Sequence, residues 1–135
     1  MGSIKKHITQ MTELEKQFLW GEIKKVEKWS VSYHLRERMR ERGGSKNLIL
    51  ELINTGTLIE YHQRNGKSRV LIRGSKIYKR DVLCAVFQFE RSTIITLYWN
   101  RHNDHHKTLK EEAYNENVDI LRLFTEEAQQ VKRSP

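Results

Sequence analysis

Residues 32–44 read Ser-Tyr-His-Leu-Arg-Glu-Arg-Met-Arg-Glu-Arg-Gly-Gly, and the rest of the chain is organised around this stretch. Ser32 can cap a helix through its hydroxyl, and Gly43 can end it in a left-handed conformation. At about 3.6 residues per turn, Leu35 and Met39 share one helix face. A second face carries His34, Arg38 and Arg42. We expect a short basic helix docked on a sheet with its charges near a groove; the alternative is a solvated surface helix.

Length and composition predict one soluble domain. The chain has 135 residues, of which 37% are hydrophobic and 31% charged, and this length can bury a core. No apolar run approaches the ~20 residues that span a bilayer, and no signal-peptide core is present, so we expect no membrane association. The single cysteine, Cys84, lies in an apolar run and is expected to be a core residue in a reducing cytoplasm.

The net charge of +8 is concentrated in the middle of the chain. Residues 1–30 carry +2, residues 31–106 carry +7 and residues 107–135 carry −1. These ranges are expected to be an N-terminal helical extension, an α+β core and a C-terminal helical tail. The basic middle segment favours a nucleic acid as partner, with RNA preferred. An acidic host protein is the alternative partner.

Helical patterns occupy the first part of the chain. A first helix is expected from about Thr12 to Trp29, because Thr12 and Glu15 have capping-box spacing. Another is expected from Lys46 to Asn54, with Thr55-Gly56 at its end. A long tail helix is expected at about 117–131. Its apolar stripe is formed by Val118, Leu121, Phe124, Ala128 and Val131.

From Thr57 the period changes to that of strands. The segment 57–63 is followed by Asn65-Gly66, a strong hairpin signal, and by a return strand at 68–73. Residues 74–76 are expected to form a bend. The runs 81–90 and 92–100 are apolar on both faces, which places them in the middle of the sheet. The predicted fold is α+β: N-terminal helices packed on a twisted four-stranded antiparallel sheet, with an added C-terminal helix.

Several segments together resemble a known family. They are His34-x-x-x-Arg38-Met39-x-x-Arg42-Gly43, Thr55-Gly56, Arg69-Val-Leu-Ile-Arg73 and Ile95-Thr-Leu-Tyr98. Over residues 31–100 the chain resembles small prokaryotic and phage proteins described only as a domain of unknown function. That family looks related to the BrnT and RelE toxin group, in which helices pack on a twisted antiparallel sheet.

The resemblance implies an RNA-binding sheet face and RNA cleavage that needs no metal. Its possible contributors, carried over to this sequence, are His34, Arg38, Arg69, Arg73 and Tyr98. Histidine can act as acid or base near neutral pH, and arginine suits a phosphate in the transition state. His34 has the alternative role of a hydrogen bond to a neighbouring strand.

The segment 64–80 contains seven basic residues and no acidic one. They are Arg64, Lys67, Arg69, Arg73, Lys76, Lys79 and Arg80. Tyr61 and Tyr78 could stack on bases beside them. The alternative is a charged edge that discourages sheet aggregation. Arg42, Arg101 and His102 complete the expected nucleic-acid-binding set.

The cluster from His102 to His106 suggests a metal site only weakly. His102 and His106 have helical ligand spacing, with Asp104 between them, but the segment is predicted to be a loop without a separate third ligand. We therefore expect neither metal nor cofactor. The cluster could instead extend a phosphate-binding surface.

Two functions remain open from the sequence. One is RNA binding of the RelE or BrnT type, extended by metal-independent endoribonuclease activity. The other is a non-catalytic interaction or inhibitor protein, of phage or mobile-element type, that binds a host protein or nucleotide. The sequence does not decide whether the protein is an enzyme. The tail helix is expected either to dock on its own domain or to form a homodimer.

Overall fold

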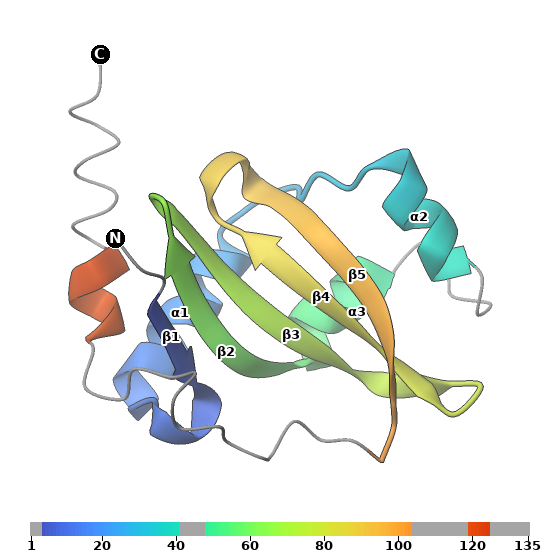
Figure 1. Cartoon of the computed structure of the whole chain (residues 1–135), viewed down its shortest axis with the longest axis horizontal. Coiled ribbons are helices and arrows are strands. Elements are labelled where there is room, and N and C mark those ends of the chain that lie inside the picture. The colour runs from blue at the N-terminus through green and yellow to red at the C-terminus, as the bar shows by residue number, and fades with distance from the viewer. Residues whose placement is uncertain (1–3, 41–47, 104–118, 125–135) are drawn as a thin grey trace.

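The computed structural model describes residues 4–40, 48–103 and 119–124, and its centre is a five-stranded antiparallel sheet (Figure 1). The strands lie in chain order, β1-β2-β3-β4-β5. Their bounds are Ile4–His7, Thr57–Arg64, Lys67–Tyr78, Asp81–Gln88 and Thr93–Arg101. The predicted mixture of helices with an antiparallel sheet is confirmed. The predicted count of four strands is wrong, because β1 adds a fifth.

Strand β1 gives almost no signal in the sequence. It has only four residues, Ile-Lys-Lys-His, and pairs with β2 so that Lys5 faces His62 and His7 faces Glu60. Lys6 and His7 are nonetheless buried. A short strand that buries a lysine has no apolar alternation, so its place in the sheet depends on partners far along the chain.

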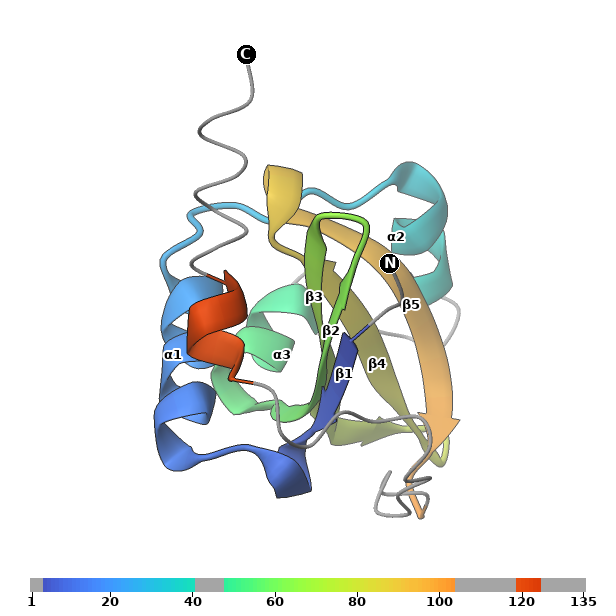
Figure 2. The same cartoon turned by 60° about the vertical axis from the view of Figure 1, so that its left-hand side comes forward.

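Helices α1 and α3 cover one face of the sheet, and α2 stands beside β5 (Figures 1 and 2). Their bounds are Glu13–Lys24 for α1, Tyr33–Arg40 for α2 and Leu48–Thr55 for α3, with 3-10 turns at Ile8–Gln10 (η1) and Glu90–Ser92 (η2). In the part of the chain that the structure describes, no helix is long and apolar enough to cross a membrane.

The local signals for helix starts are confirmed. The Thr12 hydroxyl accepts from the Glu15 backbone N–H at 3.1 Å, and the Glu15 carboxylate accepts from the Thr12 backbone N–H at 2.9 Å, as the capping box requires. Ser32 caps α2 through the Leu35 N–H at 3.2 Å. The predicted end of the basic helix at Gly43 and the predicted start of the next helix at Lys46 lie outside the described residues.

The first helix ends earlier than predicted. It stops at Lys24, and Trp29 instead turns into the core, where its ring packs edge-on against Phe87 at 5.0 Å. The indole N–H donates to the Ile23 carbonyl at 3.3 Å. The helix was predicted too long because Trp29 is apolar like the buried face of α1. It packs in the same core but lies outside the helix.

The core lies between the sheet and the helices. Alternate residues of β2 to β5 point toward α1 and α3, as expected for strands with one face on a core. Its fully or almost fully buried strand residues are Leu58, Tyr61, Val70, Ile72, Leu83, Ala85, Phe87, Ile94 and Leu97. The hairpin at Asn65-Gly66 is confirmed, with φ of 51° and 74° at the two turn residues.

Two details of the sheet differ from the prediction. Strand β3 continues to Tyr78 in place of a bend at 74–76, with only a register shift between Arg73 and Ile77. Strand β5 is an edge strand and not a central one. Helix α2 covers it: the Arg38 Nη1 donates to the Leu97 carbonyl at 3.2 Å, and the Trp99 indole donates to the Arg38 carbonyl at 3.1 Å. Helix α2 therefore occupies the edge of β5 that has no strand beside it.

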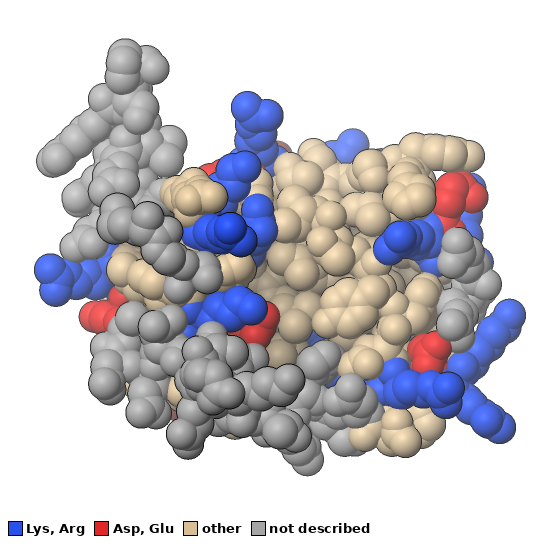
Figure 3. Space-filling view, viewed as in Figure 1, with Lys and Arg blue, Asp and Glu red and all other residues tan. Residues whose placement is uncertain are grey.

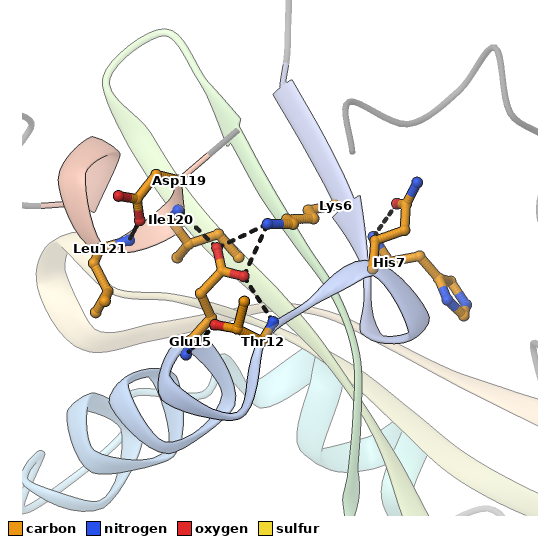
Figure 4. A network of polar contacts seen from close by, with 8 residues as sticks. Lys6, His7, Thr12, Glu15, Asp119, Ile120 and Leu121 are labelled. Carbon is orange, nitrogen blue, oxygen red and sulfur yellow. Dashed lines mark hydrogen bonds and ion pairs between the residues drawn. The ribbon is translucent and has the colours of Figure 1, made fainter. Parts of the chain in front are cut away.

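A buried ion pair joins β1 to α1 (Figure 4). The Lys6 Nζ lies 2.8 and 2.9 Å from the two carboxylate oxygens of Glu15. That carboxylate also accepts from the backbone N–H groups of Thr12 and Ile120, each at 2.9 Å. Burial raises the pKa of Glu15, but these hydrogen bonds outweigh it, so the pKa lies below its ordinary value.

The described part of the tail packs against its own chain. Residues 120–124 form a short helical segment in which Ile120 is fully buried. The Phe124 ring makes edge contacts with Phe18 at 5.1 Å and with Phe89 at 5.0 Å. Val118, Ala128 and Val131 of the predicted stripe lie outside the described residues, and the homodimer stays a prediction.

Candidate nucleic-acid interface

The sheet face opposite α1 and α3 carries most of the polar side chains that the sheet offers for recognition. Strand alternation places residues 69, 71 and 73 of β3 on this open face, as the sequence predicts. Its small apolar cluster is formed by Ile59, Leu71, Val82 and Cys84, with Val86 and Tyr98 packed against it. The predicted burial of Cys84 is confirmed.

One cross-strand row of the open face is cationic. The register aligns Lys5 of β1, His62 of β2, Arg69 of β3 and Gln88 of β4. Arg69 donates from Nε to the Gln88 side-chain oxygen at 3.1 Å, which fixes its guanidinium over the sheet. We call these four residues the cationic row.

His62 is the unusual member of the cationic row. Its Nε2 is buried and has no hydrogen-bond partner among the described residues. Burial, together with the positive charges of Lys5 and Arg69, lowers the pKa of His62 below its ordinary value. The imidazole is therefore neutral at neutral pH, and its Nε2 lies below the surface of the open face.

A second row of the open face contains Arg73, Cys84 and Tyr98. Arg73 is only 7% exposed, and its Nη2 donates to the carbonyls of Arg101 and His102 at 3.0 and 3.1 Å. Burial, with Cys84 beside the hydroxyl, raises the pKa of Tyr98. Tyr98 is therefore a protonated phenol at any physiological pH.

The structure separates the helix candidates from the cationic row. His34 is exposed on α2, whose Arg38 and Trp99 contacts attach it to β5. Arg69 lies on β3, two strands further in, which is roughly 10 Å at the usual strand spacing. Of the predicted catalytic residues, Arg73 and Tyr98 share a row of the open face, whereas His34 lies on α2, beyond the outer edge of β5. Arg42 lies outside the described residues.

The basic residues of 64–80 are divided between the two ends of the sheet. Arg64 and Lys67 flank the β2–β3 turn and are exposed on the side of the cationic row. Lys79 and Arg80 form the β3–β4 turn at the other end, both with positive φ. Figure 3 shows Lys and Arg on both sides of a broad uncharged centre of this face.

The remaining members of that predicted set have structural contacts. Lys76 lies 3.9 Å from the Glu51 carboxylate and 5.3 Å from the Tyr78 ring centre. Tyr78 itself donates to Glu51 at 3.2 Å. Tyr61 is fully buried, so the predicted stacking of a base on its ring is wrong. Arg101 is exposed at the end of β5, next to His102.

Three members of the cationic row were missed at the level of sequence. Lys5 and Gln88 carry no local signal, since only the strand register brings Lys5 beside His62 and Gln88 beside Arg69. His62 stands in the strand predicted at 57–63, and its outward position follows from alternation with buried Tyr61. That alternation was the one signal that could have found it.

Metal ligation has no support among residues 4–40, 48–103 and 119–124. No group of three or more His, Cys, Asp or Glu side chains there could hold an ion. Asp104, His105 and His106 of the sequence cluster lie outside these ranges. The described part of the cluster, His102, donates from Nδ1 to the Arg80 carbonyl at 2.8 Å.

Comparison with known proteins identifies the family and nothing closer. Neither the curated proteins nor the solved structures give a match. The relation to BrnT and RelE therefore stays a prediction. A family model described as a domain of unknown function, DUF4258, matches residues 31–99, which span α2, α3 and the sheet from β2 to Trp99. The match covers just over half of the chain, which therefore belongs to the DUF4258 family.

Proposed function

We propose that the protein binds single-stranded RNA across the open face of its sheet. The observation that carries the proposal is the cationic row, in which Lys5 and Arg69 flank an imidazole whose Nε2 has no hydrogen-bond partner among the described residues. Two cationic side chains on either side of one ring suit a phosphate group.

Neighbouring charges extend this phosphate-binding surface along one end of the face. Arg64 and Lys67 are paired across β2 and β3 and lie on the same side of the sheet as His62 and Arg69. Glu60, also on β2, is close enough to His62 for its negative charge to raise the pKa of the imidazole slightly against the other effects. The Glu90 carboxylate also lies here, on the Ser68 N–H at 2.7 Å, and four cations against two carboxylates leave a local positive excess, in line with the net charge of +8.

The apolar part of the face favours a single strand over a duplex. Val86 lies one row away from Gln88, and both Val86 and Tyr98 are half-buried, so part of their surface remains open. Unpaired bases can lie on such apolar and aromatic groups while their phosphates contact the cations. A duplex would present phosphates and leave this apolar surface unused.

The test is the affinity for a short unstructured RNA as a function of salt, measured by fluorescence anisotropy. Changing Lys5→Gln and Arg69→Gln together should weaken binding several-fold and reduce the slope of log affinity against log salt by about 1.4, the value for two lost contacts to a single strand. The matched control is Lys24→Gln with Lys28→Gln, which removes two exposed charges from the helix-covered side. Equal losses in both double variants would contradict the proposal.

The second candidate function is metal-independent cleavage of the bound RNA, with neutral His62, set between Lys5 and Arg69, as the general base. In this reaction the imidazole turns so that its buried Nε2 meets the strand and takes the proton of a 2′-hydroxyl, whose oxygen attacks the adjacent phosphorus. The P–O5′ bond breaks, and the leaving oxygen takes a proton from water, giving a 2′,3′-cyclic phosphate and a 5′-hydroxyl. Arg69 is placed to offset charge on the phosphate.

Cleavage is tested with purified protein and a labelled RNA in EDTA. His62→Gln should slow cleavage by ~10²-fold or more, the usual scale for a lost general base, and this loss should exceed any loss of RNA affinity. His34→Gln is the control, since His34 is exposed on α2. If His34→Gln alone abolishes cleavage, the base is on α2, and if no cleavage occurs at any pH, the protein is a binding module.

A further inference from the structure

A hollow of about 350 Å³ opens at the end of the sheet away from the β2–β3 turn. It is lined by the strand residues Thr57, Ile59, Arg73, Ile77 and Val82 and by His102. It lies where the register shifts between Arg73 and Ile77, so β3 leaves space beside β2 and β4. The volume falls in the range of small-molecule sites and is too small for a folded partner.

The hollow has an apolar floor and an apolar rim. Ile59 and Val82 are buried and belong to the apolar cluster of the open face. Ile77 stands at the rim and is 54% exposed, which is high for a large apolar residue in a strand. A flat ring could cover the exposed part of Ile77, and this would remove apolar surface from water.

The polar lining is held in fixed geometry. The Arg73 guanidinium is anchored by the carbonyls of Arg101 and His102, so its plane cannot rotate freely. His102 donates from Nδ1 to the Arg80 carbonyl, which leaves Nε2 as the acceptor of the neutral ring. A fixed donor group and an acceptor beside an apolar wall match the edge and the face of a heterocyclic base.

The turn that anchors His102 has an unusual backbone. Lys79 and Arg80 have φ of 48° and 71°, two successive non-glycine residues in the left-handed region. This turn aims the Arg80 carbonyl at both the backbone N–H and the Nδ1 of His102, at 3.0 and 2.8 Å. Local strain of this kind persists where the surroundings hold it, and here it fixes one wall of the hollow.

We propose that the hollow binds one nucleobase of an RNA strand whose phosphates contact the cationic row. This inference rests on the proposed function and assigns the base-recognition subsite to it. Arg69 and Arg73 lie four residues apart on one strand, about 13 Å, so the row and the hollow are separated by a short stretch of single strand.

The first test compares Ile77→Ala with Leu50→Ala. Both side chains are apolar and more than half exposed, at 54% and 56%, but Leu50 lies on α3, on the other side of the sheet. Ile77→Ala should weaken RNA binding by about tenfold, the scale of one lost base contact, and should leave the salt slope unchanged. Leu50→Ala should have no effect. Equal effects, or a salt slope reduced as in the Lys5 and Arg69 double variant, would overturn the inference.

A second measurement separates this inference from the proposed function. Methyl NMR is recorded during titration with uridine and adenosine monophosphates and with ribose 5-phosphate, which has no base. The nucleotides should shift the methyl signals of Ile77 and Val82, and ribose 5-phosphate should not. Failure of wild-type protein to bind RNA at low salt refutes the proposed function. Failure of the nucleotides to shift these methyls refutes the hollow as a base site, whatever the RNA result.

Discussion

The two faces of the sheet use the same strands for opposite purposes. On the helix-covered face, the apolar residues of β2 to β5 are closed in by α1, α3 and residues 120–124. The buried charge pair of Lys6 with Glu15 on this side is satisfied by further hydrogen bonds. On the open face, a small apolar cluster lies between rows of arginine, histidine and glutamine. Polar groups on the first face hold the fold together, and those on the second are the ones that we propose contact a ligand.

The same contrast appears within the open face. Arg69 and Arg73 stand on one side of one strand, yet Arg73 is buried against two carbonyls and Arg69 is partly exposed over Gln88. Residue type and alternation alone would assign them the same role. Their surroundings differ, and in the proposed complex Arg69 contacts a phosphate while Arg73 holds a wall of the hollow.

The largest expected effect is at the buried charge on the covered side. Glu15→Ala should lower the free energy of unfolding by about 4 kcal/mol, because it leaves the Lys6 ammonium buried without its partner. The measurement is denaturant unfolding followed by circular dichroism.

The control for this change is the double variant Lys6→Met with Glu15→Gln, which removes both charges and should recover much of the loss. In the wild type, stability should also fall as the pH drops below 4.5 toward the lowered pKa of Glu15, because the unfolded chain then binds the proton first. A double variant as unstable as Glu15→Ala would show that the ion pair is not the cause.

The next effect compares neighbours on opposite faces of β3. Ile72 is 0% exposed toward the helices and Leu71 is 8% exposed on the open face. Ile72→Ala should cost about 3 kcal/mol of stability and Leu71→Ala about half as much, since the open side can relax and admit water. Both are measured by denaturant unfolding, and equal costs would show that the open face is packed as tightly as the covered one.

A smaller effect concerns pH and the open face. The pKa of His62 is lower in the folded protein than its ordinary value of 6.5, so the unfolded state binds the proton first as the pH falls. Stability should be complete above pH 6.5 and should decline as the pH falls from there through the lowered pKa. His62→Gln should remove this decline in unfolding curves, whereas His34→Gln should retain it. A decline that survives in His62→Gln belongs to another group.

The smallest effect is expected at the cations of the row themselves. Lys5→Gln and Arg69→Gln should each change the free energy of unfolding by no more than about 0.5 kcal/mol, because partly exposed charges contribute little to stability. Thermal unfolding of each variant provides the measurement. A loss comparable to that of Ile72→Ala would mean that the cationic row serves the fold, and its part in binding would need another explanation.

Sequence predictions succeeded where the signal was local. The Thr12 and Glu15 capping box, the Ser32 cap and the Asn65-Gly66 turn are all in place. Each depends on residues no more than three positions apart, whose geometry is set by backbone sterics and short hydrogen bonds. Alternation likewise predicted which face residues 69 to 73 present.

Predictions failed where an apolar segment could be buried by more than one arrangement of the surrounding elements. Trp29 looked helical because it shares the core of α1, and β5 looked central because α2 covers its outer edge. Apolar residues indicate burial, but they do not say which element provides the cover. The number of strands was wrong for the converse reason, since β1 is a strand with almost no apolar pattern.

The sequence by itself thus determined the class of fold, the β2–β3 hairpin, the burial of Cys84 and the positive charge of the middle of the chain. Only the tertiary structure decided that Lys5 lies next to His62 and His62 next to Arg69, and that the Arg73 guanidinium donates to the carbonyls of Arg101 and His102. The physical reason is range. Turns and caps are fixed by neighbours in the chain, whereas strand register and the partner of a buried charge are fixed by residues tens of positions away, which no local pattern specifies.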